Sequence, residues 1–410
     1  MPTPDPPGLA RLKVAIACRQ VAGLSGATTV VLEQSRRLAA LGCEVHVYGD
    51  DLDVLRLEDC GAAPHRLPRW PFGSYPRRRL FAWLFERAVA GRGFDVLWGH
   101  GDALRQDILT LHNCVHAAHE AVRGSPLPSS SGVGRLHDRL LRGGGFAALI
   151  ANSELMKEEV VRRFGVPARK VWVVHPGHDP ARFRAEDRPR LGPEARAELG
   201  VGETELLVGL VTSGDFAKRG VGPFLDALAD LKPELRRRLR LLIMGRETRL
   251  GPYRERVARA GLADRTRFLP PAADVERYYH ALDVYVHPAL YEEFGMSILE
   301  AMACGTPVLT SRRVGAAEVL ARAPESRAAL LERPEPRALR AALERLLGDA
   351  GLRSSVGEAG ARVARGEDWE ANFAKTLACL RAVLKERGSA LATAGALAPR
   401  RAPRPPPSRG

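Results

Sequence analysis

A pair of glutamates with a glycine-containing loop between them is the feature of this chain best suited to chemistry. Glu292 and Glu300 lie in the string HPALYEEFGMSILEAMACGTPVL, residues 287–309, and enclose the triplet Phe294-Gly295-Met296. Apolar, β-branched residues at the start of this region predict a strand, and the apolar run after the triplet predicts a short helix. The N-terminus of such a helix directs free N–H groups into the loop, and Gly295 lacks a Cβ that would keep an anion away. The pattern predicts a binding site for a diphosphate group.

The same residues also allow a purely structural interpretation. Ser297 and Glu300 have the S-x-x-E spacing of a capping box, in which the glutamate would only stabilise the start of the helix. That interpretation leaves Glu292 and the intervening glycine without a role. We therefore favour the binding site.

The whole string resembles the E-x7-E signature of retaining glycosyltransferases of family 4 (group 1), which reads YEGFGLPVLEAMACGTPVV. The resemblance extends over residues 12–385. It implies the GT-B architecture, an α/β fold in which two Rossmann-like doubly wound domains face each other across a cleft. It also implies that Glu292 takes part in catalysis by holding donor-sugar hydroxyls, and that Glu300 holds ribose hydroxyls. A carboxylate suits both roles because its two oxygens accept from a vicinal diol.

A second loop, SGDFAKRG at residues 213–220, offers cations for the same phosphates. Negative charge grows on a departing diphosphate, so cations and N–H groups beside it stabilise the transition state. Most family members read G-R-x4-K-G, whereas this chain has Arg219 at the lysine position and Gly214 at the arginine position. The string is more similar to the S-D-F-x-R-K-G of lipopolysaccharide-core hexosyltransferases. Lys218 and Arg219 are both candidates for the phosphate contact; the alternative is that both are exposed charges at a helix start.

Three further site positions follow from the resemblance. Ser25-Gly26 stands where the family has Gly-Gly, at a helix start across the cleft from the phosphates. His112 ends the predicted strand ILTL, at the edge where α/β folds bind ligands, and many members place a histidine there beside the anomeric centre. Gly245 and the string RFLP at 267–270 fall where the family lines the base pocket. A structural role is the alternative for His112, and the competing candidates are His100, His116 and His119.

The rest of the chain alternates predicted strands with amphipathic helices, which is typical of doubly wound α/β domains. The alternation predicts an N-terminal domain over residues 11–183 and a C-terminal domain over residues 184–368. The resemblance implies that the first binds the acceptor and the second binds the donor. The resemblance implies that a last helix, within residues 369–388, returns to the N-terminal domain. The proline-rich start, 1–10, and the basic Pro/Ala/Arg-rich end, 389–410, are predicted to be disordered.

Composition narrows the class of protein. The 410 residues are 45% apolar, which is enough for two domains, and they contain no run of about 20 apolar residues that could cross a bilayer. No apolar signal core is found near the N-terminus and the six cysteines lack C-x-x-C spacing, so we expect a cytoplasmic protein with reduced thiols. The net charge of +14 favours anionic substrates, and no nucleic-acid-binding motif accompanies it.

Asp51-Leu52-Asp53 has the D-x-D pattern that holds a metal in a different glycosyltransferase fold. It follows the second predicted strand of the acceptor domain, away from the predicted donor site, so we interpret it as a solvated turn. No metal or other cofactor is expected, because helix N-termini and cations can neutralise a diphosphate.

Residues 66–89, RLPRWPFGSYPRRRLFAWLFERAV, interleave aromatic residues with arginines. This mixture suits a peripheral contact with an anionic membrane, here the inner leaflet of the cytoplasmic membrane. The alternative is a helix that packs its aromatic residues into the domain.

Together the motifs and the resemblance predict a glycosyltransferase that moves a sugar from a nucleotide-diphosphate donor to a glycan or lipid-linked acceptor, in cell-envelope polysaccharide or lipopolysaccharide biosynthesis. The resemblance implies that the enzyme is retaining. One alternative is a GT-B enzyme that makes a soluble glycoside or acts as a phosphorylase. Another is a catalytically silent sugar-nucleotide binder. The sugar, the base and the acceptor stay open at this point.

Overall fold

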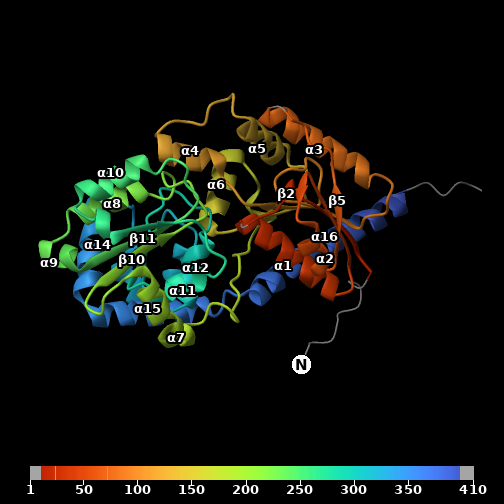
Figure 1. Cartoon of the computed structure of the whole chain (residues 1–410). Helices are drawn as coiled ribbons and strands as arrows, with labels where there is room; N and C mark the ends of the chain where they lie inside the picture. The colour runs from red at the N-terminus through yellow and green to blue at the C-terminus, as the bar shows by residue number, and fades with distance from the viewer. Residues whose placement is uncertain (1–10, 24, 72, 398–410) are drawn as a thin grey trace, which may run out of the picture.

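The computed structural model describes residues 11–23, 25–71 and 73–397, and these form two α/β halves, each built around one parallel sheet (Figure 1). The strand order is β5-β3-β1-β6-β7-β8-β9 in the N-terminal half and β12-β11-β10-β13-β14-β15 in the C-terminal half. Every pair of neighbouring strands in these two sheets is parallel. The predicted α/β class with two Rossmann-like doubly wound domains is confirmed.

In the N-terminal half, helices cover both faces of the sheet, because successive side chains of a strand point to opposite faces. In the first strand, Val14 and Ile16 join one apolar core with α1, whereas Ala15 and Ala17 join a second core with α3. The strands are β1 (Lys13–Ala17), β3 (Glu44–Gly49), β5 (Ala62–Arg66), β6 (Val96–Gly99), β7 (Ile108–Leu111), β8 (Ala148–Ala151) and β9 (Val171–Val173), and β2 (Gln20–Val21) pairs with β4 (Asp51–Leu52) beside them. The helices are α1 (Gly26–Ala40), α2 (Val54–Asp59), α3 (Ser74–Val89), α4 (Val115–Arg123), α5 (Gly132–Gly143) and α6 (Glu154–Phe164), with a 3-10 turn at Ala168–Lys170.

The C-terminal half repeats this plan, and its central strands are buried along their whole length. The strands are β10 (Leu206–Val211), β11 (Leu239–Met244), β12 (Thr266–Leu269), β13 (Val284–His287), β14 (Val308–Ser311) and β15 (Leu330–Leu331). The helices are α7 (Arg188–Leu199), α8 (Val221–Ala229), α9 (Pro233–Arg238), α10 (Gly251–Arg259), α11 (Val275–Ala281), α12 (Met296–Ala303), α13 (Ala317–Leu320), α14 (Pro336–Gly348) and α15 (Ala350–Ala364), with 3-10 turns at Ala185–Asp187, Ala263–Arg265 and Pro324–Ala329. The central strands β10 and β13 have no exposed residue, as expected for a sheet covered on both faces.

Both sheets have a point at which the strand order reverses. In the N-terminal half the chain moves to one side of β1 with β3 and to the other side with β6, and in the C-terminal half β10 lies between β11 and β13 in the same way. Crevices at the carboxyl ends of strands form at such points, and they are where open α/β sheets bind ligands.

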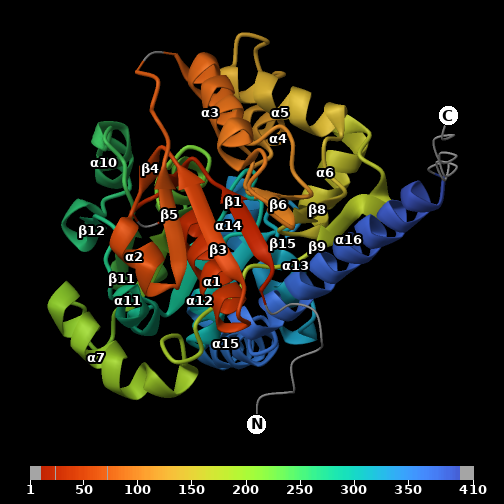
Figure 2. The same ribbon diagram turned by 90° about the vertical axis from the view of Figure 1, so that its right-hand side faces the viewer.

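The last helix, α16 (Trp369–Leu397), leaves the C-terminal half and runs along the N-terminal half, as predicted (Figure 2). Phe373, Cys379, Leu380 and Val383 join the apolar core formed by β1 and α1. The helix includes the first nine residues of the tail that was predicted to be disordered from 389. That boundary was wrong because the Ala- and Leu-rich segment after Gly388 has high helix propensity. The remaining residues predicted to be disordered, 1–10 and 398–410, lie outside the described part of the chain.

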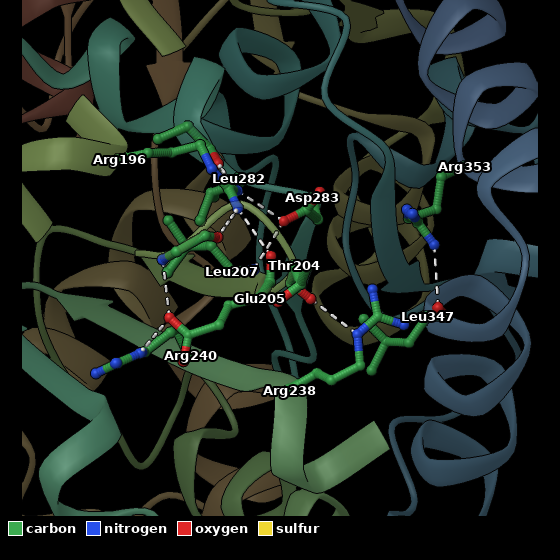
Figure 3. Close-up of polar contacts among 12 residues, drawn as sticks. Arg196, Thr204, Glu205, Leu207, Arg238, Arg240, Leu282, Asp283, Leu347 and Arg353 are labelled. Atoms are coloured by element: carbon green, nitrogen blue, oxygen red, sulfur yellow. Dashed lines mark hydrogen bonds and ion pairs between the residues drawn. The ribbon is translucent and has the colours of Figure 1, made fainter. Parts of the chain in front are cut away.

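Several arginines form hydrogen bonds that hold loops at the amino ends of the strands in the C-terminal half (Figure 3). The carboxylate of Asp283 accepts from the N–H of Leu207 at 2.7 Å and from Arg196 Nη1 at 2.8 Å. Arg238 Nε donates to the carbonyl of Thr204 at 2.8 Å. Part of the positive charge is therefore structural, and it lies at the edge of the sheet opposite to the ligand-binding edge.

Candidate active site

A cavity of about 580 Å³ lies between the two halves, at the carboxyl ends of their strands. Nine predicted site residues line it, and they come from both halves of the chain. They are Gly26, His112, Lys218, Arg219, Glu292, Phe294, Gly295, Met296 and Glu300. The tertiary structure thus places almost the whole predicted site around one cleft.

The triplet 294–296 forms a tight turn into α12, and the turn faces the cleft. Gly295 has φ 93° and ψ 69°, a left-handed conformation that favours glycine, and it caps α12 at its N-terminus. An added Cβ there would lie 3.2 Å from side-chain atoms of Ile298 and Val314. Phe294 is buried, and its carbonyl accepts from the N–H of Ala316 at 2.8 Å, which fixes the turn. The first N–H groups of α12 have no intrahelical acceptor and are available to an anion.

Glu300 does not form a capping box. The N-cap of α12 is Gly295, not Ser297. The Glu300 carboxylate instead accepts from the hydroxyl of Tyr279 at 2.9 Å, and the Ser297 hydroxyl accepts from Tyr285 at 2.8 Å. Burial raises the pKa of the Glu300 carboxyl, and the Tyr279 hydrogen bond opposes this shift. Glu300 is therefore a hydrogen-bonded carboxylate in the cleft wall, which is compatible with the predicted ribose contact.

Lys218 and Arg219 both project into the cleft, so the alternative of two exposed charges at a helix start is wrong. Their side chains are 14% and 13% exposed. Lys218 Nζ donates to Glu293 Oε2 at 2.8 Å. Arg219 forms an ion pair with Glu292, and its Nε donates to the hydroxyl of Thr212 at 3.0 Å. The two cations are thus each matched by one carboxylate.

His112 is the end of a chain of hydrogen-bonded side chains in the N-terminal half. Its Nε2 lies 2.8 Å from Nδ1 of His100, and His100 Nε2 lies 3.1 Å from Oε1 of Gln34. Burial lowers the pKa of His112 to about 4, and the nearby Glu293 carboxylate partly opposes this shift. Burial also lowers the pKa of His100, with the neighbouring His112 adding to the shift. Both imidazoles are therefore neutral at pH 7. Nδ1 of His112 takes no part in the hydrogen bonds that link His112, His100 and Gln34.

The three other candidate histidines, His100, His116 and His119, do not line the cleft. His116 pairs with Asp138 at 3.4 Å, and His119 lines a different cavity, on the α4 side. His100 lies behind His112 and does not line the cleft. Of the four candidates, His112 is the one in the cleft wall.

Gly245 is the predicted site residue that the structure does not place in the cleft wall. It follows β11, donates its N–H to the carbonyl of Leu269, and an added Cβ would lie 2.8 to 3.0 Å from Phe216 and Thr212. The RFLP residues likewise do not line the cavity. That wall is formed by Met244 and by residues 271–273, because the backbone of Gly245 is already engaged in the sheet.

One cleft residue that sequence reasoning missed is Glu293. It is 4% exposed, and its Oε1 accepts from the N–H of Cys114 at 2.9 Å, across the cleft. The doubled glutamate in YEEFG was the available signal, since the resembling family string has glycine at this position. Nothing in the sequence indicated its partner in the other half.

The D-x-D triplet has a structural role. Asp51 lies in β4 and accepts from Gln20 Nε2 at 3.3 Å, and Asp53 caps α2 through the N–H of Arg56. Within the described ranges, no group of three or more His, Cys, Asp or Glu side chains could hold a metal ion.

Two family models match consecutive parts of this chain. The model described as Glycosyl transferases group 1 matches residues 193–363, and the model described as Glycosyltransferase Family 4 matches residues 24–182. The two matches coincide with the two halves of the fold. The chain belongs to the family 4 (group 1) glycosyltransferases and has the GT-B fold.

Similar curated proteins carry the name D-inositol 3-phosphate glycosyltransferase. The one from Kineococcus radiotolerans is 33% identical over 59% of this chain and 58% of its own length. The one from Thermobifida fusca is 28% identical over 88% of this chain and 89% of its own length. This chain spans only 51% to 58% of the length of the first relatives it matches.

Solved structures agree on the fold. WaaG, a glycosyltransferase involved in lipopolysaccharide biosynthesis, superposes with a TM-score of 0.76 at 20% identity, covering 89% of this chain and 98% of WaaG. HepE from Anabaena, solved with UDP and glucose, has a TM-score of 0.71 at 20% identity, covering 90% of this chain and all of HepE. At this identity the likeness establishes architecture alone.

Proposed function

We propose that the protein transfers a sugar, with retention of anomeric configuration, from a nucleoside diphosphate sugar to an acceptor hydroxyl. The observation that carries this proposal is the meeting of Lys218, Arg219 and the N-terminus of α12 with Glu292 and Glu300 in one cleft. Cations and free N–H groups on one wall suit the diphosphate, and carboxylates suit the hydroxyls of the sugar and the ribose. The presence of UDP in the similarly folded HepE supports a nucleotide donor.

In the proposed reaction, the bond between the anomeric carbon and the phosphate oxygen breaks as the acceptor oxygen bonds to the same face of that carbon. The acceptor proton passes to the departing phosphate oxygen, so no protein base is needed for it. The family resemblance supports this route. The charge left on the diphosphate is stabilised by Lys218, Arg219 and the N–H groups at the start of α12.

His112 and Glu292 hold the reacting sugar in this proposal. His112 is neutral because burial lowers its pKa to about 4, so it offers a hydrogen bond without adding positive charge near the anomeric centre. Glu292 accepts from sugar hydroxyls once Arg219 turns to the diphosphate. Both residues then orient the substrate rather than form a covalent bond to it.

The proposed acceptor is a glycan or lipid-linked molecule that carries negative charge. Arg19, Asp50 and Asp102 form a buried group at the carboxyl edge of the N-terminal sheet, where Arg19 pairs with Asp50 at 3.3 Å and Arg78 with Asp102 at 2.7 Å. Neighbouring Arg77 has a buried Nε without a hydrogen-bond partner. The arginines exceed the carboxylates, which favours an anion such as a phosphate. The relatives named for D-inositol 3-phosphate support an acceptor that carries a phosphate. WaaG, which is involved in lipopolysaccharide biosynthesis, supports a role in the cell envelope.

Peripheral membrane contact is part of this proposal. Phe81 and Phe85 are buried, which fits the packing alternative for that part of the segment, but Trp70 and Trp83 are 45% and 51% exposed. Arg87 lies over the Trp83 ring, 4.9 Å from its centroid. Exposed tryptophans beside arginines suit a headgroup surface. Among the described residues, no helix is long and apolar enough to cross a bilayer.

A panel of nucleoside diphosphates and their sugars, read by thermal unfolding and by release of the free nucleotide, tests the proposed function. A ligand that binds only the folded state raises the unfolding temperature. We expect one nucleoside diphosphate sugar to stabilise the protein and to be turned over. A phosphorylase would respond to a sugar phosphate or inorganic phosphate instead, and a silent binder would show stabilisation without turnover.

A further inference from the structure

Glu293 connects the predicted phosphate-binding loop to the opposite half of the molecule. Its carboxylate accepts at Oε2 from Lys218 Nζ, 2.8 Å away, and at Oε1 from the N–H of Cys114, 2.9 Å away. Its carbonyl accepts from the Ser153 hydroxyl at 2.6 Å. Cys114 and Ser153 are the N-caps of α4 and α6 in the N-terminal half. A single residue therefore makes two hydrogen bonds across the cleft and one to a phosphate cation.

The packing around Glu293 indicates that this contact is part of the fold. Tyr291, two residues earlier, is 1% exposed and belongs to the apolar core formed by β7, β8, α5 and α6 of the other half. Gly315 lies so close to Ser153 that an added Cβ would be 2.8 Å from its hydroxyl oxygen. The loop that carries Glu292 and Glu293 is thus held by the N-terminal half.

The two cations of the 213–220 loop are each paired with a carboxylate before any ligand arrives. Lys218 pairs with Glu293, and Arg219 pairs with Glu292. The exposed fractions of these four side chains range from 5% to 14%, so water screens the charges poorly. A diphosphate adds negative charge to this group, and Lys218 then has two acceptors, the Glu293 carboxylate and the phosphate. A buried carboxylate beside a diphosphate is energetically unfavourable unless a cation stays paired with it.

We propose that Glu293 is a positioning residue that holds Lys218 in the cleft from the opposite half and competes with the donor diphosphate for its ammonium group. This inference rests on the proposed function, because it takes the ligand to be a diphosphate. Lys218 is correctly placed only while Glu293 is fixed by Cys114 and Ser153, so the phosphate cation depends on the contact between the two halves. Glu293 thus keeps Lys218 in place, and it weakens the binding of the diphosphate.

Replacing Glu293 by Gln tests the competition directly. The amide keeps the shape and an oxygen acceptor for the Cys114 N–H, but it removes the negative charge. We expect UDP, measured by calorimetry on the full chain, to bind E293Q about tenfold more tightly than the wild type. The matched control is Glu318→Gln, because Glu318 also accepts across the halves, from the N–H groups of Glu154 and Leu155 at 3.0 and 2.8 Å, but does not contact Lys218. We expect UDP affinity within twofold of the wild type for E318Q.

A charge rescue separates this role from a purely structural one. Lys218→Met leaves the Glu293 carboxylate unpaired beside the diphosphate, so we expect UDP binding to weaken about tenfold or more. Adding Glu293→Gln to that variant removes the unpaired charge, and we expect it to recover UDP affinity by a larger factor than E293Q gains alone. Equal or weaker UDP binding in E293Q, or a double variant no better than K218M, would overturn the inference.

Inorganic pyrophosphate, used in parallel, separates failure of the inference from failure of the proposed donor. If pyrophosphate shows the expected order among the variants but no nucleoside diphosphate binds, the role of Glu293 stands and the proposed nucleotide donor is wrong. If UDP binds the wild type and E293Q equally, the donor stands and the role of Glu293 is wrong.

Discussion

Gly26 and Met296 meet across the cleft, although 270 positions separate them in the sequence. A Cβ added to Gly26 would lie 3.0 Å from Sδ of Met296. Gly26 begins α1 directly after Ser25, whose hydroxyl accepts from the N–H of Thr28, and Met296 begins α12. The N-termini of two helices from opposite halves thus approach each other at the same point of the cleft, and the absence of a side chain at Gly26 makes this approach possible.

Gly26→Leu should therefore reduce activity by steric conflict with Met296. We expect turnover of the nucleotide sugar to fall about tenfold, since small misplacements at a reacting centre have effects of this size or larger. Combining Gly26→Leu with Met296→Ala should restore part of the lost turnover, because it makes room for the added side chain. A double variant as slow as Gly26→Leu alone would show that the conflict lies elsewhere.

His100→Ala should lower turnover through His112. His100 is buried behind His112 and fixes its ring through the 2.8 Å contact between Nδ1 and Nε2. We expect kcat to fall about tenfold with UDP affinity within twofold of the wild type, because His112 acts on the sugar in the proposed site.

A second histidine pair in the same half supplies the control for His100. His46 Nδ1 lies 2.8 Å from His65 Nε2, and these rings also stack, but neither residue lines the cleft. His65→Ala should leave turnover unchanged. An equal loss of turnover in both variants would assign the effect to stability of the half rather than to His112.

Glu292→Ala should abolish sugar transfer and leave the fold intact. The proposed contact of Glu292 with donor hydroxyls is lost, and turnover should fall about a thousandfold. Circular dichroism and the unfolding temperature check the fold, and Glu332→Ala, at an 82% exposed carboxylate, is the control for charge removal. Turnover close to that of the wild type would remove Glu292 from the site.

Stability should rise with pH between about 4 and 6.5. Burial lowers the pKa of His137 from its ordinary 6.5 to about 4, and the neighbouring Arg78 adds to this shift. The unfolded chain therefore binds the proton first as pH falls, so the contribution of His137 is complete above 6.5 and is lost on the way to 4. The difference corresponds to roughly 3 kcal/mol. Denaturant unfolding at pH 4.5 and 7 should show a smaller pH effect in His137→Gln, and an unchanged effect would show that His137 titrates normally.

Replacing Arg77, Arg78 and Arg79 by Gln should weaken co-sedimentation with anionic vesicles. Each cation near such a surface contributes about 1 kcal/mol, and Arg78 is already paired with Asp102. The loss of the other two should therefore lower the partition coefficient about thirtyfold. The matched control is the triplet Arg236 to Arg238 at the end of α9 in the other half. Vesicle binding that is unaffected by the first replacement would rule out residues 66–89 as a membrane contact.

Local sequence determined the elements of this fold and most residues of the site. The loop from Glu292 to Glu300 could be recognised because it combines a predicted helix start, a glycine and two carboxylates within one short stretch. The structure gives that glycine a φ of 93°. The alternation of strands and helices predicted two doubly wound domains, since a strand and a helix each have their own apolar period. These features depend on neighbours in the chain, which a sequence displays directly.

The tertiary structure decided which side chains meet. Glu293 accepts hydrogen bonds from Cys114 and Lys218. His112 contacts His100, and Gly26 lies against Met296. All of these contacts join elements that are far apart in the chain. Gly245 was predicted in the cleft from the family resemblance, but its backbone pairs with Leu269, and the wall is formed by Met244 and residues 271–273. Distances of this kind depend on how two sheets and their loops pack against each other, and the packing is set by the sum of many buried contacts rather than by any local pattern.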